Sequence, residues 1–284
     1  LKVMGDAINK PKGEINFDTC TEQELSDYCY RDVEITRDSV LALIKFVRQK
    51  DFGSFQFTCA GQAFTAYKHR FMPYKIFIHA NLDAIALERA SYRGGRNEAY
   101  YIGDIPKTCY YLDVNSLFPF VMEKYEYPCK LRRVISGVSV DRLIGYLGSF
   151  AVIARVKIEI QHPFIGLKTN RLMFPVGTFW ATLTSPEIDA VNRTGKILEV
   201  GQVALYKKVF LFKKWVNEVY AMRREFIEAE NPVFADFSKI SLNSLYGKFG
   251  QKSGEFKEIG TADPNVVKVE RYLDFTTKKK CIEY

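Results

Sequence analysis

The hydrophobic positions of the chain follow two periods, and each period predicts one kind of element. Between Thr21 and Lys50 apolar residues recur at the spacing of one helix face, and Thr21 with Glu24 forms a capping-box pattern at the start. Similar patterns predict helices over Ala60 to His69, Leu82 to Arg93, Phe210 to Glu230 and Val233 to Phe249. Asn231-Pro232 breaks the last two apart.

Alternation of apolar and polar residues predicts strands over Phe150 to Ile160 and Ile197 to Leu205. Short apolar and aromatic runs predict further strands at Tyr100 to Ile102 and Tyr110 to Val114. The last part, Glu255 to Tyr284, is expected to hold short strands with turns at Asp263-Pro264 and Lys278 to Lys280. The mixture of segregated helices and strands predicts the α+β class.

The stretch YYLDVNSLFPF, from Tyr110 to Phe120, carries the first chemical signal. Its strand-like run leads into Asp113, and Pro119 is expected to fix the turn that follows. A carboxylate at the end of a buried strand is costly unless a metal ion or a basic side chain faces it. We therefore expect a cation near Asp113.

The helix over Val233 to Phe249 carries the second signal. Lys239, Asn243 and Tyr246 fall on one face, which suits a phosphate, a base edge and a sugar or base ring. The hairpin formed at the break is expected to bring Arg223 or Arg224 near this face, and convergent cations favour a bound anion such as phosphate. A solvated amphipathic helix is the alternative interpretation of this helix by itself.

Composition adds a basic and aromatic character. Lys and Arg number 41 against 33 Asp and Glu, and the 17 Tyr and 22 Phe bring aromatic residues to 14%. Such a chain suits a phosphate backbone and stacked bases, although a basic protein with a large aromatic core has the same composition. The 6 Cys form no CxxC pair, which disfavours a zinc ribbon or a disulfide framework. With no signal peptide and no long apolar run, we expect an intracellular protein that is neither secreted nor bound to a membrane.

Four segments, in the order of the chain, resemble the motifs of family B DNA polymerases of the protein-primed type found in viruses, phages, linear plasmids and organelles. The segments are YCYRD at Tyr28 to Asp32, SYRGGR at Ser91 to Arg96, YLDVNSLFPF from Tyr111 and KISLNSLYGKFG from Lys239. They are similar to the third exonuclease motif YxxxD, the YxGG loop, the first palm motif DxxSLYP and the fingers motif KxxxNSxYG. The fingers motif is matched at every fixed position.

The resemblance implies a polymerase site in the palm motif. Asp113 would ligate both catalytic metals, Mg²⁺ or Mn²⁺, and the carbonyl of Val114 would complete the shell. The backbone N–H groups of Leu117 and Phe118 would contact the incoming triphosphate. Phe118 stands where the family usually has Tyr, so its ring would still exclude a 2′-hydroxyl while the hydrogen bond of the Tyr hydroxyl is lost.

The fingers motif implies the rest of the nucleotide site. Lys239 and one of Arg223 or Arg224 would bind the phosphates of the nucleotide. Asn243 and Tyr246 would line the nascent base pair. The sequence does not separate the two arginines.

The resemblance also implies DNA contacts upstream. Tyr92, Gly94, Gly95 and Arg96 would hold the template strand, with the glycines allowing close approach of the backbone, and Ser116 would contact DNA as well.

The exonuclease motif implies a second site. Asp32 would ligate a metal of a 3′–5′ exonuclease, and Tyr28 would orient the attacking water.

The implied fold is a partial family B polymerase. It comprises the C-terminal part of an RNase H-like exonuclease domain, a partial palm with an insertion, and fingers made of a helical hairpin. The expected division is exonuclease at 1–55, a connection with the YxGG loop at 56–105, palm at 106–125, insertion at 126–205, fingers at 206–250, and a return toward the palm with a second insertion hairpin at 251–284.

No Asp-Thr-Asp motif follows Gly247, and no Asp-x-Glu or Asn-x-x-x-Asp motif precedes Tyr28. We therefore expect a central fragment that neither extends nor degrades a primer alone. The expected partners of the whole protein are primer-template DNA, deoxynucleoside triphosphates and a terminal priming protein. The expected location is the host cytoplasm for a phage or virus and the mitochondrion for a linear plasmid.

Two other interpretations remain open. A non-catalytic DNA-binding remnant or scaffold of the same fold would use the basic surface without a metal. A nuclease or nucleotidyltransferase of another family would need further acidic pairs, and Glu187 and Asp189 in SPEID, the only candidates, resemble a helix N-terminus that carries acids.

Overall fold

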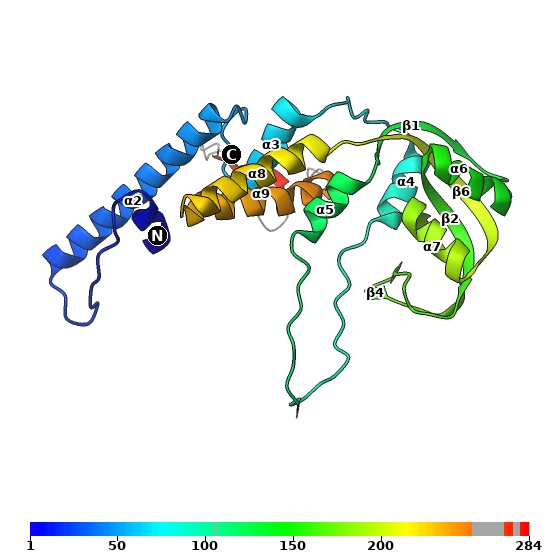
Figure 1. Ribbon diagram of the computed structural model, residues 1–284, viewed down its shortest axis with the longest axis horizontal. Helices are drawn as coiled ribbons and strands as arrows, with labels where there is room; N and C mark the ends of the chain where they lie inside the picture. The colour runs from blue at the N-terminus through cyan, green and yellow to red at the C-terminus, as the bar shows by residue number, and fades with distance from the viewer. Residues whose placement is uncertain (106, 252–269, 275–278, 284) are drawn as a thin grey trace. The chain divides into compact units, whose positions relative to one another are not determined.

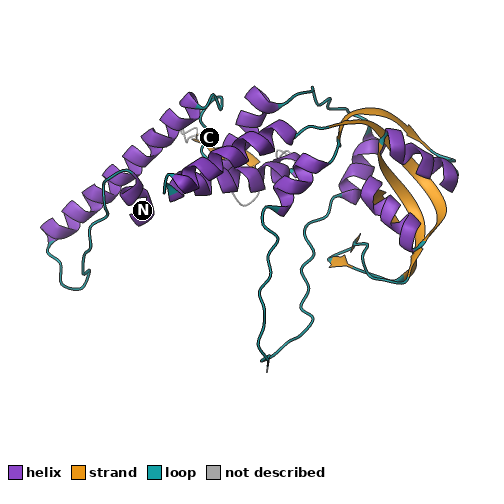
Figure 2. Cartoon of the chain, in the orientation of Figure 1, coloured by secondary structure: helices purple, strands orange, loops and turns teal. Residues whose placement is uncertain are grey.

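The computed structural model describes residues 1–105 and 107–251 and the backbone of residues 270–274 and 279–283. The chain divides into two compact units, Leu1–Leu245 and Tyr246–Tyr284. The predicted α+β class is confirmed, with helices and strands, and every described strand pair is antiparallel (Figures 1 and 2). Among the described helices, none has the length and apolar character that crossing a lipid bilayer demands.

The first core is helical and aromatic. It is formed by the end of α2 (Glu22–Gln49), by α3 (Cys59–Ala66) with the π-helical turn η1 (Tyr67–Phe71), and by α8 (Lys213–Glu228) with α9 (Pro232–Gly250). The short α1 (Lys2–Ala7) packs on α2. The indole of Trp215 is fully buried and its ring lies 5.1 Å from the ring of Phe71, edge to face. Rings that bury large apolar areas therefore fix how α8 and α9 lie on the preceding helices.

The predicted helices are confirmed, together with two of their end signals. Thr21 caps α2: its N–H donates to the carboxylate of Glu24 at 2.8 Å, and the N–H of Glu24 donates to the Thr21 hydroxyl at 3.3 Å. At the start of α9 the N–H of Phe234 donates to the Asn231 side chain at 3.2 Å. Asn231-Pro232 thus ends one helix and begins the next, as predicted.

The second core lies in an antiparallel sheet of order β1-β6-β2-β5. Its strands are β1 (Tyr127–Ile135), β2 (Ala151–Ile160), β5 (Gly177–Thr184) and β6 (Lys196–Val209). Alternate residues of β2 face helices α6 (Val140–Ser149) and α7 (Ser185–Thr194), while Ala151 and Ile153 face α4 (Leu82–Ser91). The predicted strands at Phe150 to Ile160 and Ile197 to Leu205 are confirmed.

The predicted strands at Tyr100 to Ile102 and Tyr110 to Val114 are wrong. Both stretches lie in the long loop that joins α4 to α5 (Leu117–Lys124), as Figure 2 shows, and neither pairs with a described strand. The side chains of Tyr110 and Leu112 are 86% and 88% exposed, so the premise of a buried strand fails as well. An extended run becomes a strand only when a neighbouring strand takes up its backbone hydrogen bonds, and the described residues supply none here.

The predicted role of Pro119 is also wrong. It does not fix a turn but stands in the first turn of α5, where its missing N–H costs no helical hydrogen bond. Ser116 precedes the helix in a left-handed conformation with φ 55°.

Two short hairpins complete the described structure. β3 (Leu167–Lys168) pairs with β4 (Leu172–Met173), and β7 (Glu270–Asp274) pairs with β8 (Lys279–Glu283). The strands predicted near the end of the chain are thus confirmed at β7 and β8, but Lys279 and Lys280 lie in a strand and not in a turn. Lys278 and the turn predicted at Asp263-Pro264 lie outside the described residues.

Candidate functional site

A cleft of about 720 Å³ lies between the end of the α4–α5 loop and the hairpin of α8 and α9. Its lining is Leu112, Asp113, Val114, Asn115, Ser116, Leu117, Phe118, Tyr220, Arg223, Arg224, Ile227, Lys239 and Asn243. All of these residues belong to the first compact unit. The structure therefore brings together most of the residues that the palm and fingers motifs predict.

The two helices present these side chains because their other faces are buried. On α8 the buried positions Trp215 and Val219 fix the helix on the core, which turns Arg223 and Arg224 toward the cleft. On α9 the buried Leu242 does the same for Lys239 and Asn243, four residues apart.

The cleft carries an excess of positive charge. Arg223, Arg224 and Lys239 line it against the single carboxylate of Asp113. Arg224 is 3.9 Å from Glu228, whereas Asp113, Arg223 and Lys239 have no ion-pair partner among the residues that the structure describes. Convergent cations repel one another unless an anion lies between them, so the cleft suits a polyanionic ligand.

The start of α5 adds backbone donors. Leu117 and Phe118 are its first two residues and line the cleft. The N–H groups of a first helical turn point out of the helix end, where they attract anions such as phosphate oxygens. The ring of Phe118 is 48% exposed. Tyr246 lies one turn beyond Asn243 on α9, at the first residue of the second unit.

The predicted DNA-binding loop contains both residues that are open to solvent and a residue that is bound to the chain. A Cβ at Gly94 or Gly95 would meet no described atom within 4 Å, so the protein itself does not require glycine there. Tyr92 is 47% exposed. The guanidinium of Arg96, by contrast, donates to Glu98 at 2.6 Å and to the Pro163 carbonyl at 2.7 Å, which ties it to the chain.

Arg93 is the residue of this loop that the sequence did not single out. Its guanidinium pairs with the carboxylate of Glu187 and donates to the carbonyl of Thr182 at 2.5 Å. The side chain is only 12% exposed. Glu187 also accepts from the N–H of Thr184 at 2.8 Å, completing the capping box of α7, so the helix start predicted at SPEID is confirmed. Arg93 thus joins the loop to the sheet.

The exonuclease motif forms a small cluster on α2. Tyr28 and Asp32 lie four residues apart, and the ammonium of Lys12 is 3.2 Å from Asp32 Oδ2 and 5.0 Å from the centre of the Tyr28 ring. Two hydrogen bonds raise the pKa of Lys12, and the one with Tyr28 contributes more than the one with Asp32. Asp32 Oδ1 is buried without a hydrogen-bond partner among the described residues. The sequence did not single out Lys12, because no periodic pattern relates it to Tyr28 or Asp32. Only the negative charge of Asp32 indicates that a cation is needed nearby.

The cleft contains a single carboxylate among the residues that the structure describes. Asp113 is the only carboxylate among the residues that line the cleft, and the part of the chain that the structure describes holds no cluster of three or more His, Cys, Asp or Glu side chains. Asp113 and the Val114 carbonyl fit one divalent ion, whereas two ions need a further carboxylate. These residues by themselves therefore do not suffice for a two-metal bond-forming step.

Comparison with known families gives one match over nearly the whole chain. The family described as DNA polymerase type B, organellar and viral, matches residues 8–282. A probable DNA polymerase of Neurospora intermedia is 23% identical over 248 residues, covering 81% of this chain and 25% of its own length. A DNA polymerase of Kluyveromyces lactis is 24% identical over 270 residues, covering 89% of this chain and 26% of its own. The chain thus spans about a quarter of the length of these relatives.

Solved structures give the same fold. The chain is similar to Phi29 DNA polymerase complexed with primer-template DNA and incoming nucleotide substrates, with a TM-score of 0.61 at 19% identity. The match covers 100% of this chain and 50% of that polymerase.

Proposed function

The chain belongs to the type B DNA polymerases of organelles and viruses, and from this premise we propose that its cleft binds the triphosphate of an incoming deoxynucleotide. One observation carries the proposal. Three separate segments of the chain line a single cleft with an excess of positive charge, and they contribute Asp113, the pair Arg223 and Arg224, and the pair Lys239 and Asn243. A polyphosphate with its divalent cation matches that distribution of charge.

Each residue then has a defined task. Lys239 and the two arginines hold the phosphates. The N–H groups at the start of α5 donate hydrogen bonds to the remaining phosphate oxygens. Asp113 and the Val114 carbonyl hold Mg²⁺ or Mn²⁺, which neutralises charge on the phosphates when it is bound.

The side chains around the phosphates select the rest of the nucleotide. Phe118 limits the space beside the sugar, and Asn243, with Tyr246 further along α9, faces the base pair.

For the whole protein we propose template-directed deoxynucleotidyl transfer in DNA replication, primed by a terminal protein. In this proposal residues 106–125 belong to the palm, 126–205 to the insertion and 206–250 to the fingers. Tyr92, Gly94 and Gly95 contact the template strand, since the space beside the glycines is open to a ligand. The similar Phi29 polymerase complex contains primer-template DNA and incoming nucleotides, which supports these partners.

We also propose that Tyr28, Asp32 and Lys12 belong to the 3′–5′ exonuclease. The unpartnered Oδ1 of Asp32 is available to a metal ion, and Lys12 lies beside both motif residues. This site is independent of the nucleotide cleft.

Calorimetric titration of dATP with Mg²⁺ into the full chain tests the nucleotide site. We expect binding that weakens roughly ten- to a hundredfold in Lys239→Ala, because each charge-assisted hydrogen bond contributes about 1.5–3 kcal/mol. Lys196→Ala removes an exposed lysine at the start of β6, outside the cleft, and should leave the affinity unchanged. Titration with ATP adds a test of Phe118, since ATP should bind more weakly than dATP.

Two results would count against the proposal. One is equal affinity of Lys239→Ala and the wild-type chain for dATP. The other is binding of primer-template DNA with no nucleotide binding, which favours the scaffold interpretation.

A further inference from the structure

A second groove lies on β1 and β6, outside the nucleotide cleft. It has a volume of about 400 Å³ and is lined by Tyr74, Lys75, Phe77, Cys129, Lys130, Arg132 and Lys207. Four of these seven residues are cations and none is an acid. Tyr74 and Phe77 are 52% and 51% exposed, so aromatic rings lie open between the charges.

The backbone of the sheet sets this arrangement. The N–H of Phe77 donates to the carbonyl of Cys129 at 2.8 Å, which holds the segment before α4 against β1. Lys130 and Arg132 are two residues apart on β1, and both line the groove although the register of the strand shifts between Leu131 and Arg133. Lys207 of β6 stands directly opposite Lys130 in the antiparallel register.

Folding alone does not explain this charge pattern. Like charges placed directly opposite each other destabilise a sheet. Within residues 1–105 and 107–251, none of Lys75, Lys130, Arg132 or Lys207 has an ion-pair partner. The ammonium of Lys130 lies 4.8 Å from the centre of the Phe77 ring. The groove therefore holds an uncompensated positive field that an external anion would relieve.

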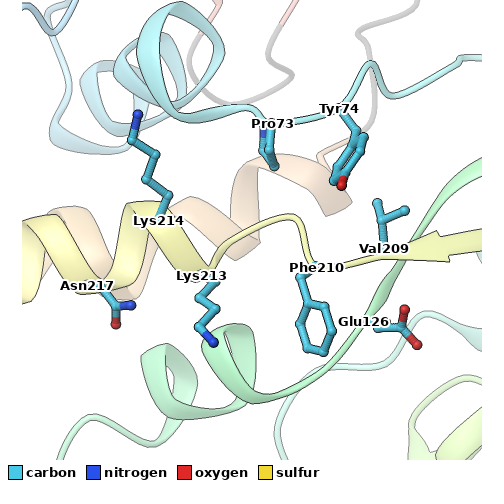
Figure 3. Close-up of a pocket in the computed structure, with 8 residues that line it drawn as sticks. All are labelled: Pro73, Tyr74, Glu126, Val209, Phe210, Lys213, Lys214 and Asn217. Atoms are coloured by element: carbon cyan, nitrogen blue, oxygen red, sulfur yellow. The ribbon is translucent and has the colours of Figure 1, made fainter.

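The same surface continues past Tyr74 to the start of α8. A neighbouring hollow of about 430 Å³ is lined by Tyr74, Phe210, Lys213 and Lys214 among others (Figure 3). Figure 3 shows the Phe210 ring and the Lys213 ammonium on the same side of the turn between β6 and α8. Phe210 is 47% exposed.

The charges at this end add to the positive field. The first turn of α8 carries the two lysines Lys213 and Lys214 and no acidic residue. Positive side chains are unfavourable there because the N-terminal end of a helix dipole is itself positive. The carboxylate that lines the hollow, Glu126, is 3.5 Å from Lys208 and so is already paired.

We propose that this surface, here called the basic groove, binds a single-stranded segment of nucleic acid. The phosphates lie on Lys75, Lys130, Arg132, Lys207 and Lys213, and unpaired bases stack on Tyr74, Phe77 and Phe210. Cations interleaved with exposed rings are the combination that single strands use, because each nucleotide brings a charge and an aromatic face. A nucleic-acid duplex is a poorer ligand because its base faces are buried in the stack. An acidic protein surface would pair with the cations but would leave the three exposed rings without stacking partners.

The basic groove is distinct from the nucleotide cleft, although both use α8. Lys213 and Arg223 are ten residues apart on that helix, which places them about 15 Å from each other along its axis. The inference therefore does not depend on the proposed nucleotide site.

Fluorescence anisotropy with labelled oligothymidylate of 20 nucleotides and the full chain tests the charges. In Lys130→Gln/Lys207→Gln we expect at least about tenfold weaker binding. The slope of log K against log salt concentration should become shallower by roughly 1.4, because each of the two lost phosphate contacts contributes about 0.7. The thermal midpoint should stay equal or rise, because the variant removes a like-charge pair. Binding of dATP with Mg²⁺ should not change.

The matched control is Lys168→Gln/Lys196→Gln. It removes the same charge from two exposed lysines, and Lys196 stands eleven residues before Lys207 on β6, about 36 Å away along the strand. We expect no effect on oligothymidylate binding. Equal weakening by the two double variants would mean that only the net charge matters and would overturn the proposal.

The rings are tested separately with Tyr74→Leu/Phe77→Leu, which keeps every charge. We expect binding to weaken at least about fivefold with an unchanged salt slope, since each stacked base contributes about 1–3 kcal/mol. Unchanged affinity in this variant, or equal affinity of the wild-type chain for a duplex of the same length, would overturn the assignment to single strands.

Discussion

Strand β2 and the segment Tyr110–Val114 have similar apolar sequences but opposite environments. In β2, alternate side chains from Val152 to Ile160 are 0–1% exposed, and the strand pairs with β5 on one side and β6 on the other. In Tyr110–Val114, the first three side chains are 86–94% exposed and the backbone pairs with no described strand. Residues Leu112 to Phe118 line the cleft beside α8 and α9. An apolar run thus belongs to a core in one place and lines an open cleft in the other.

The largest expected effect on the free energy of unfolding comes from a substitution in the buried strand β2. Ile158→Ala removes three carbons from a fully buried site in the sheet core and should lower the free energy of unfolding by about 2–5 kcal/mol. Leu198→Ala, at a residue of β6 that is 43% exposed, is the control and should cost about 1 kcal/mol or less. Urea unfolding followed by circular dichroism measures both. Equal losses would contradict the description of the core.

A smaller effect is expected where the loop is joined to the sheet. Arg93→Met leaves Glu187 without its cation, with only the hydrogen bonds of the capping box, and should destabilise the chain by roughly 1.5–3 kcal/mol. Arg96→Met changes the same residue type at a side chain that is 36% exposed and should cost less than about 1 kcal/mol.

A double-mutant cycle of Arg93→Met with Glu187→Gln measures the coupling between the two side chains. A coupling energy near zero would show that Arg93 does not hold the loop through Glu187.

The smallest effect on stability is expected in the exposed segment itself. Leu112→Ser should leave the free energy of unfolding within about 0.5 kcal/mol of the wild-type value, because the side chain is 88% exposed. The same urea titration checks it. A loss above about 1 kcal/mol would mean that Leu112 is packed in solution, and the contrast with β2 would fail.

Local patterns predicted the helices and much of the cleft. The faces of α8 and α9 follow from their own apolar period, and Asn231-Pro232 sets the break between them. Because a short break makes the two helices neighbours, the convergence of Arg223 with Lys239 could be expected from sequence, and the cleft contains both. The roles assigned to these residues remain proposals.

Contacts between distant parts of the chain could not be predicted in this way. Whether Tyr110–Val114 becomes a strand depends on a partner strand that no local pattern specifies. The contacts of Lys12 with Asp32 and of Arg93 with Glu187 likewise join residues that no period relates.

The most direct test of the central claim compares two ligands on the unmodified chain. Calorimetry of dATP and of dAMP, each with Mg²⁺, separates the phosphates from the base and sugar that the two ligands share. If the cleft is a triphosphate site, dATP should bind at least about tenfold more tightly, because dAMP lacks two of the three phosphates that Arg223, Arg224 and Lys239 hold. Equal affinity for the two ligands would contradict the account.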